Sequence, residues 1–270
     1  ASRLQIMDRL AALKLAVKVI PAARPLVLTG SGSASRVFQT LDHLGVKRPL
    51  IVTDAMLAEL GVIDPVLRKI KRLGGSPSLF TGVIPDPTHQ VVEQGLATLR
   101  RDSCDAVLAI GGGSSIDAAK VIALAAGNDT GPGKLVGLFK GRKPALPLFV
   151  IPTTAGTGSE VTVAAVISDD RTHRKALVID PKVVPLGAAL DPKLMQGMPP
   201  RVTADTGIDA LTHALEAWIS DFANAETDRY AGAAVRLVLE NLPRAYHQGD
   251  DLKARDAMAL ASHYAGLAVN

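Results

Sequence analysis

Three consecutive glycines stand between an apolar stretch and a run of good helix formers in the segment GGGSSIDAAK (111–120). Glycine lets the backbone approach a ligand closely, and the free N–H groups at a helix start attract phosphate. The Gly-Lys-Ser/Thr ending of a Walker loop is missing. We therefore predict that Gly112, Gly113 and Ser114 bind a phosphate. The Ser-x-x-Asp spacing also resembles a capping box, so we interpret Asp117 as a helix-capping residue.

Asp54 closes the apolar segment PLIVTD (49–54). Ligands of doubly wound sheets bind beyond the carboxyl ends of the strands, where an acid can accept hydrogen bonds from ribose hydroxyls and repel a 2′-phosphate. Asp54 is equally suited to cap a helix that begins at Ala55, and both interpretations stay open. Gly30 and Gly32 also follow an apolar stretch, but a lone G-x-G is a weak signal, and a plain strand-to-helix turn explains it at least as well.

The segment IPTTAGTGSEVT (151–162) is a second loop rich in glycine and threonine that follows an apolar stretch. Its hydroxyls and small side chains suit contact with a sugar or a nicotinamide ring. A plain turn explains the segment equally well, so its residue types alone leave the choice open.

Asp209 and His213 are four positions apart in a helix predicted over 203–220, so they share one face. A carboxylate and an imidazole at this spacing can bind one divalent metal ion. They can also form a helix-surface pair that contributes roughly a few tenths of a kcal/mol. From the spacing alone, the surface pair is the favoured interpretation.

Short apolar segments alternate with helical segments over most of the chain, which is typical of an α/β fold with a parallel sheet covered on both faces. The apolar segments are 25–30, 49–54, 104–113 and 147–154, and the helical ones are 33–45, 55–61, 64–73 and 114–127. Segments 160–168 and 174–180 are predicted to be further strands, paired as a hairpin.

The pattern is different at the two ends of the chain. Residues 4–20 have the periodicity of a helix. After about residue 192 only helices are predicted, over 203–220, 226–242 and 251–269. We therefore predict an α/β nucleotide-binding domain over residues 1–192 and the start of an all-helical domain over residues 193–270.

The composition excludes several classes of protein. A net charge of +4 with dispersed basic residues and 3% aromatics argues against nucleic-acid binding. No apolar run has the length of a membrane span, and the first residues lack a signal-peptide pattern. Cys104 is the only cysteine, which fits a reducing compartment. A cytoplasmic protein without nucleic-acid or membrane partners is expected.

The longest motif, MPPRVTADTGIDALTHALEAWIS (198–220), strongly resembles the signature region of the iron-containing (group III) alcohol dehydrogenases. The motifs VTD, PDPT (85–88), GGGSSIDAAK and IPTTAGTGSEVT occur in the order and approximate spacing of that family. The resemblance extends from about residue 25 to the C-terminus. It implies a Rossmann-like nucleotide-binding domain followed by an all-helical domain, with NAD(P) and a divalent metal, usually iron and sometimes zinc, in the cleft between them.

The resemblance also implies roles for individual residues. Asp54 matches the acid that contacts the adenosine ribose, and Asp209 and His213 match the first two metal ligands. The remaining cofactor contacts that the motifs imply are Gly112, Gly113 and Ser114 at the pyrophosphate, Thr153, Thr154 and Thr162 near the nicotinamide, and Lys175 at a ribose. The implied activity is hydride transfer between a small alcohol, or its aldehyde or ketone, and NAD(P), by a homo-oligomer, by family expectation a dimer.

Two features depart from the family pattern. Asp86 stands where family members often have Asn. Two further histidine ligands are expected in a later helical region, and none of the six histidines has their motif, so we expect the chain to be part of a longer one and to have doubtful activity alone. A lyase related to dehydroquinate synthase and a non-catalytic nucleotide-binding or assembly module are the alternative functions.

Overall fold

The computed structural model describes residues 23–172 and 174–270. The helix predicted over residues 4–20 lies outside the described residues. Within this range, no helix is both long and apolar enough to cross a membrane.

The main sheet has six parallel strands, in the order β1-β9-β6-β4-β2-β3. Their bounds are β1 (Leu26–Thr29), β9 (Gly187–Leu190), β6 (Leu148–Pro152), β4 (Ala106–Gly111), β2 (Pro49–Asp54) and β3 (Ser78–Val83). Every residue of the central strand β4 is buried, because helices cover both faces of the sheet. The predicted parallel α/β fold is confirmed.

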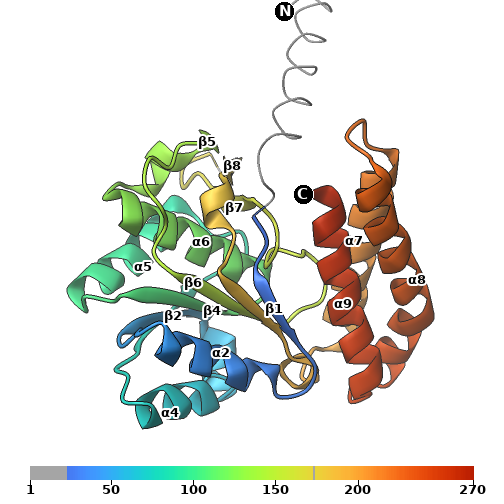
Figure 1. Cartoon of the computed structure of the whole chain (residues 1–270), viewed down its shortest axis with the longest axis horizontal. Coiled ribbons are helices and arrows are strands. Elements are labelled where there is room, and N and C mark those ends of the chain that lie inside the picture. The colour runs from blue at the N-terminus through green and yellow to red at the C-terminus, as the bar shows by residue number, and fades with distance from the viewer. Residues whose placement is uncertain (1–22, 173) are drawn as a thin grey trace, which may run out of the picture.

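Helices lie on both faces of this sheet (Figure 1). α2 (Ser33–His43) and α4 (Asp64–Arg72) cover one face, and α5 (His89–Arg101) and α6 (Gly113–Asn128) cover the other. The short α3 (Ala55–Glu59) follows β2 directly. α6 is apolar on almost every side, and its residues from Ser115 to Ala125 are all buried. It therefore forms the centre of its layer.

The strand order reverses direction between β2 and β4. From β2 the chain moves outward to β3, then returns across the sheet to add β4 on the other side of β2. Such a topological switch point opens a crevice at the carboxyl ends of the two strands, where ligands of doubly wound folds bind.

A second, three-stranded sheet has the order β5-β8-β7. β7 (Ala164–Ser168) and β8 (Lys175–Ile179) pair antiparallel, which confirms the predicted hairpin. β5 (Gly137–Leu138) adds at the edge of β8.

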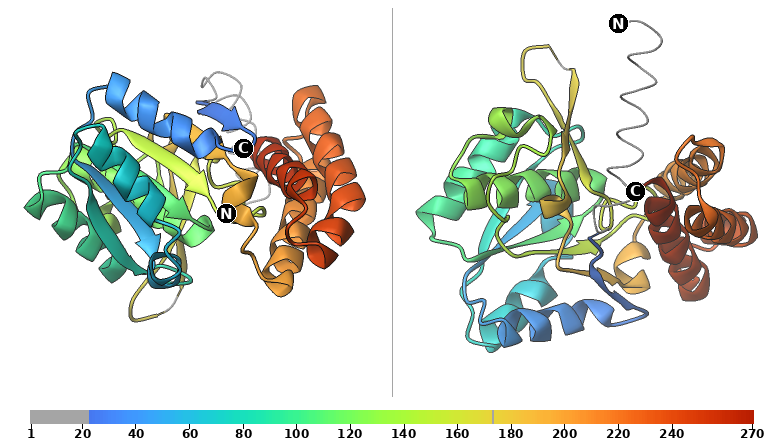
Figure 2. Two further views of the ribbon diagram at one scale, coloured as in Figure 1. Left: turned by 90° about the horizontal axis from the view of Figure 1, so that it is seen from below. Right: turned by 45° about the horizontal axis from the view of Figure 1, so that its top comes forward.

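Three long helices follow the sheet and stand beside it as a separate group (Figures 1 and 2). They are α7 (Pro200–Ile219), α8 (Ala225–His247) and α9 (Leu252–Val269). Their shared core is rich in alanine, which lets the helix backbones approach closely. α8 continues past Pro243, beyond the predicted end at residue 242, because Ala245 is buried in that core.

The turn that ends α6 provides a test of the packing. A Cβ atom on Gly127 would overlap the carbonyl oxygen of Pro144. Alanine is the better helix former by about 1 kcal/mol, yet we expect Gly127→Ala to lower the free energy of unfolding by about 1–3 kcal/mol, since the backbone must move. Urea denaturation measures the change. Gly197→Ala is the matched control, because no atom lies within 4 Å of its added Cβ. Equal stability of the two variants would contradict the expectation.

Candidate functional site

Three sequence-predicted segments meet at one edge of the sheet. Asp54, Gly111 and Pro152 end the adjacent parallel strands β2, β4 and β6, and Gly111 is in register with Pro152. The carboxyl ends of these strands therefore lie side by side at the switch point. The acid, the glycine run and the threonine-rich loop are neighbours in space although about 100 residues separate the first from the last.

The start of α6 is open to an anion. Its N-cap is Gly112, and no side chain caps the helix. A helix start without a capping side chain leaves backbone N–H groups free, and the helix dipole favours negative charge there. These features fit a phosphate group, as the sequence predicts for Gly112, Gly113 and Ser114.

The interpretation of Asp117 as a capping residue is wrong. Its carboxylate is buried and accepts a hydrogen bond from the backbone N–H of Val166, 2.9 Å away in β7, and another from the Ser159 hydroxyl. Burial raises the pKa of this carboxyl, and the nearby Lys120 ammonium opposes the rise. Asp117 thus joins α6 to the second sheet and does not cap the helix start.

The glycine run also supports the protein's own packing. A Cβ on Gly111 would lie 2.5 Å from the Ser115 hydroxyl. A Cβ on Gly112 would lie 3.2 Å from the Thr154 side chain, and one on Gly113 would lie 2.7 Å from Thr157. The threonine-rich loop therefore rests directly on the glycine run.

Asp54 is the N-cap of α3. Its carboxylate accepts a hydrogen bond of 2.9 Å from the backbone N–H of Leu57. The capping interpretation is thereby confirmed. That the Asp54 side chain also contacts a ribose, at the end of β2, stays a prediction.

The G-x-G segment forms a turn that leads into α2. A carboxylate of the protein already binds the backbone at the start of that helix. Gly30 and Gly32 have φ angles of 87° and 85°, which only glycine adopts readily. The buried Asp191 carboxylate accepts a hydrogen bond of 3.2 Å from the Ala34 backbone N–H, in the first turn of α2. A negative charge therefore sits where a phosphate would bind, which favours the plain turn.

We call residues 153–163 the threonine loop. Thr153 is buried, and its N–H donates to the carbonyl of Gly111 at 3.0 Å. The Thr162 hydroxyl accepts a hydrogen bond of 3.0 Å from the ammonium of Lys120. Contacts of Thr153, Thr154 and Thr162 with a nicotinamide stay predictions.

Lys120 is a functional-site neighbour that the sequence analysis did not single out. Its ammonium group is fully buried and also donates to the carbonyl oxygens of Thr162 and Ala164, both at 2.7 Å. Burial lowers the pKa of Lys120 to about 8, while Asp117 and Glu160 oppose that shift. A lysine inside the apolar run AAKVIALAA is the signal that points to a buried, fully bonded cation.

Lys175 lies at the start of β8 and pairs with Asp86. The Nζ–Oδ1 distance is 3.0 Å, and both side chains are exposed. Asp86 has a φ of 52°, in the left-handed region. Asn tolerates this conformation as well as Asp does, so the backbone is compatible with the Asn that the family resemblance led us to expect here.

Asp209 and His213 are one turn apart on α7, with Oδ1 and Nε2 3.8 Å from each other. This distance is too long for a hydrogen bond, whereas an ion about 2.0–2.2 Å from each atom can reach both. Nδ1 of His213 is buried and has no partner among the described residues. The pair therefore fits two ligands of one metal ion. Within residues 23–172 and 174–270, no group of three or more metal-binding side chains comes together.

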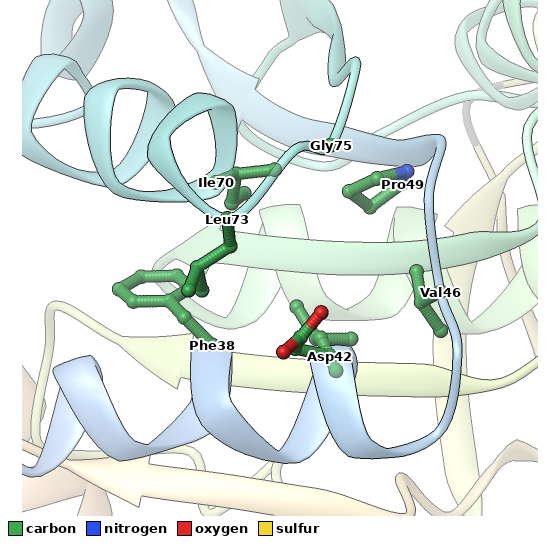
Figure 3. A pocket seen from close by; sticks show the side chains of 8 residues that line it. Phe38, Asp42, Val46, Pro49, Ile70, Leu73 and Gly75 are labelled. Atoms are coloured by element: carbon green, nitrogen blue, oxygen red, sulfur yellow. The ribbon is translucent and has the colours of Figure 1, made fainter.

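Two hollows of the molecule lie away from these residues. A cavity of about 10 Å³, room for one water molecule, lies between α2 and α4 near Pro49, at the amino end of β2 (Figure 3). A groove of about 380 Å³ is lined by Leu148 and Leu186, at the amino ends of β6 and β9. Neither hollow is at the carboxyl edge that carries the candidate site.

Two family models match most of the chain. The model of the iron-containing alcohol dehydrogenases matches residues 25–192, and the C-terminal model of the Fe-containing alcohol dehydrogenase family matches residues 203–270. The chain is also 42% identical over 246 residues to an NAD-dependent methanol dehydrogenase of Bacillus methanolicus. That match covers 91% of this chain and 65% of the relative, so the chain spans less than two thirds of its length.

Solved structures give the same result. An alcohol dehydrogenase from Oenococcus oeni has a TM-score of 0.90 and 33% identity, covering 93% of this chain and 67% of that one. A sulfoacetaldehyde reductase from Bifidobacterium kashiwanohense, solved in complex with NAD+, has a TM-score of 0.84 and 31% identity, covering 93% and 66%. The resemblance that the motifs indicate is thus confirmed, and the chain belongs to the iron-containing alcohol dehydrogenase family.

Proposed function

We propose that this chain is the nucleotide-binding part, with the beginning of the metal-binding part, of an oxidoreductase that transfers a hydride between a small alcohol and NAD(P). The observation that carries the proposal is the meeting of Asp54 and the uncapped start of α6 at the switch point. The methanol dehydrogenase it resembles is NAD-dependent, which supports the choice of cofactor.

In this proposal, residues at the carboxyl edge of the sheet contact different parts of the cofactor. Asp54 holds the adenosine ribose, and the start of α6 holds the pyrophosphate through backbone N–H groups. Thr153, Thr154, Thr162 and Lys175 contact the nicotinamide half. NAD supplies the hydride acceptor, and the protein's task is to hold its reactive ring in place.

Asp209 and His213 hold a divalent ion, iron or zinc, together with ligands from outside these 270 residues. The ion supplies Lewis acidity toward the alcohol oxygen. Asp209 contributes a negatively charged oxygen, and His213 contributes a neutral nitrogen. We also propose the division into domains at residues 1–192 and 193–270, a cytoplasmic location and a homo-oligomer.

The phosphate site is tested by adding a negative charge at the start of α6. Ser114→Asp should weaken NAD binding about tenfold or more through repulsion of the pyrophosphate. The folded state should be unaffected or stabilised by about 0.3–1 kcal/mol, because Asp is favourable in a first helical turn. Calorimetric titration and thermal unfolding measure the two effects.

Ser35→Asp is the matched control for the phosphate site. Ser35 is exposed in the first turn of α2, so the variant adds the same charge at the competing G-x-G turn. We expect native NAD affinity. If Ser35→Asp weakens binding and Ser114→Asp does not, the phosphate site lies at Gly30 and Gly32.

The choice between NAD and NADP is tested at Asp54. Asp54→Asn keeps an oxygen that caps α3, and Asn caps helices as well as Asp does. Removing the charge should therefore narrow the preference for NAD over NADP about tenfold without loss of stability. Asp64→Asn removes an exposed charge at the start of α4 and should leave the ratio unchanged. If the ratio of NAD to NADP affinity is unchanged in Asp54→Asn as well, Asp54 only caps α3.

The metal pair is tested by titrating the 270-residue chain with Zn²⁺ or Fe²⁺. Catalytic zinc sites use three protein ligands, so two ligands on one helix should bind weakly, and the chain alone should turn over alcohols negligibly. Asp209→Ala or His213→Ala should abolish the remaining binding, whereas His247→Ala, at an exposed histidine of α8, should not. Tight stoichiometric metal that survives both substitutions would place the site elsewhere. NAD binding without any metal binding or turnover would favour a non-catalytic nucleotide-binding module.

A further inference from the structure

The threonine loop is fixed from one side by α6, the helix whose start carries the glycine run. Lys120 donates to Thr162 and Ala164, and Asp117 bonds to Ser159 and to the backbone N–H of Val166. The loop therefore cannot move along α6 without breaking bonds to buried charged groups.

The same loop is fixed from the other side by α9. The Glu160 carboxylate lies 3.1 Å from Nδ1 of His263, and the two side chains are 3% and 8% exposed. The backbone N–H of Gly158 donates to the Ser262 hydroxyl at 3.2 Å. These two contacts from α9 thus reach the loop at Gly158 and Glu160, two residues apart.

The backbones of the loop and α9 are also in close contact. A Cβ on Gly158 would lie 2.7 Å from the Cα of Gly266, and Gly158 has a φ of 62°. The Asn270 side chain accepts a hydrogen bond of 2.8 Å from the Val163 N–H. A small movement of α9 is therefore transmitted to the loop, because no space separates them.

We propose that Glu160 and His263 are a pair of positioning residues that hold the threonine loop in the shape needed for the nicotinamide half of the cofactor. This inference rests on the function proposed above. Thr154 and Thr157 of the loop lie against Gly112 and Gly113. The bond between Glu160 and His263 thus fixes, through the loop, where threonine side chains stand relative to the bound pyrophosphate.

The physical basis is the cost of a buried carboxylate that loses its hydrogen-bond partner, because the electrostatic attraction of the Lys120 ammonium does not replace that bond. Within the part of the chain that the structure describes, His263 makes the only hydrogen bond to the Glu160 side chain. A buried charge that loses its partner is strongly destabilised, so the loop must shift to bring Glu160 toward water. Such a shift alters the loop and leaves Asp54, on the far side of the glycine run, in place.

The experiment compares NAD with ADP, which contains the adenosine and pyrophosphate groups but no nicotinamide. His263→Leu removes the bond to Glu160 and replaces the imidazole with an apolar side chain of similar size. We expect the Kd for NAD to rise about tenfold, as the loss of one hydrogen bond to a charged group implies, and the Kd for ADP to stay within about twofold. Calorimetric titration of the 270-residue chain measures both constants.

Three further variants control this comparison. His263→Asn places an amide N–H near the position of Nδ1 and should restore NAD affinity. Lys253→Ala alters an exposed side chain in the first turn of α9, ten residues before His263, and should leave NAD affinity unchanged. Ser262→Ala removes the bond to Gly158 and should weaken NAD binding a few-fold, with ADP unaffected. It replaces His263→Leu if circular dichroism shows that variant to be unfolded.

The outcomes separate the two proposals. Native NAD affinity in folded His263→Leu and Ser262→Ala would overturn the positioning role. An equal loss of NAD and ADP affinity would also overturn it, because it indicates general loosening of the fold. If the unaltered chain binds neither ligand, the proposed nucleotide-binding function itself fails.

Discussion

The arrangement of the candidate site depends on one buried cation. The Lys120 ammonium has three protons, and it has three acceptors: two carbonyl oxygens and the Thr162 hydroxyl. These bonds offset the desolvation that lowers its pKa to about 8, and they join α6 to the loop before β7. Because α6 begins with the glycine run, the cation fixes the distance between that run and the threonine loop.

The glycines of the site illustrate how one residue type meets two demands. Close approach of a ligand requires a helix start without side chains, which Gly112 and Gly113 provide. The same positions face Thr154 and Thr157, so any Cβ there would press on the loop as well as on a ligand. A substitution of Gly113 therefore cannot distinguish lost binding from disturbed packing. A charge at Ser114, which is partly exposed, makes that distinction.

Much of the fold was predictable from the sequence, because strong periodicity and long apolar runs mark β4, α6 and the helices after residue 200. The segment of β9, GAAL, lacks β-branched side chains and was not predicted as a strand. Its pairing with β1 and β6 compensates for its weak strand propensity.

The error at Asp117 has a similar origin. Its spacing from Ser114 is that of a capping box, but its partner is Val166, 49 positions away, and local spacing carries no information about such a contact. The edge that gathers Asp54, the glycine run and the loop follows from strand order, which depends on crossovers and not on local pattern.

The threonine loop also connects the carboxyl edge of the sheet with the Asp209–His213 pair. A Cβ on Gly156 would lie 2.7 Å from Cβ of Thr206, so the loop backbone packs directly on α7. Asp209 follows Thr206 by three residues, which places it about one helical turn farther along α7. The loop thus touches the glycine run through Thr154, α7 through Gly156 and α9 through Glu160. Because these contacts lie within seven consecutive residues, a displacement of either α7 or α9 changes the separation between the carboxyl edge of the sheet and the Asp209–His213 pair. The loop is therefore the element that sets the position of the Asp209–His213 pair relative to the carboxyl edge of the sheet.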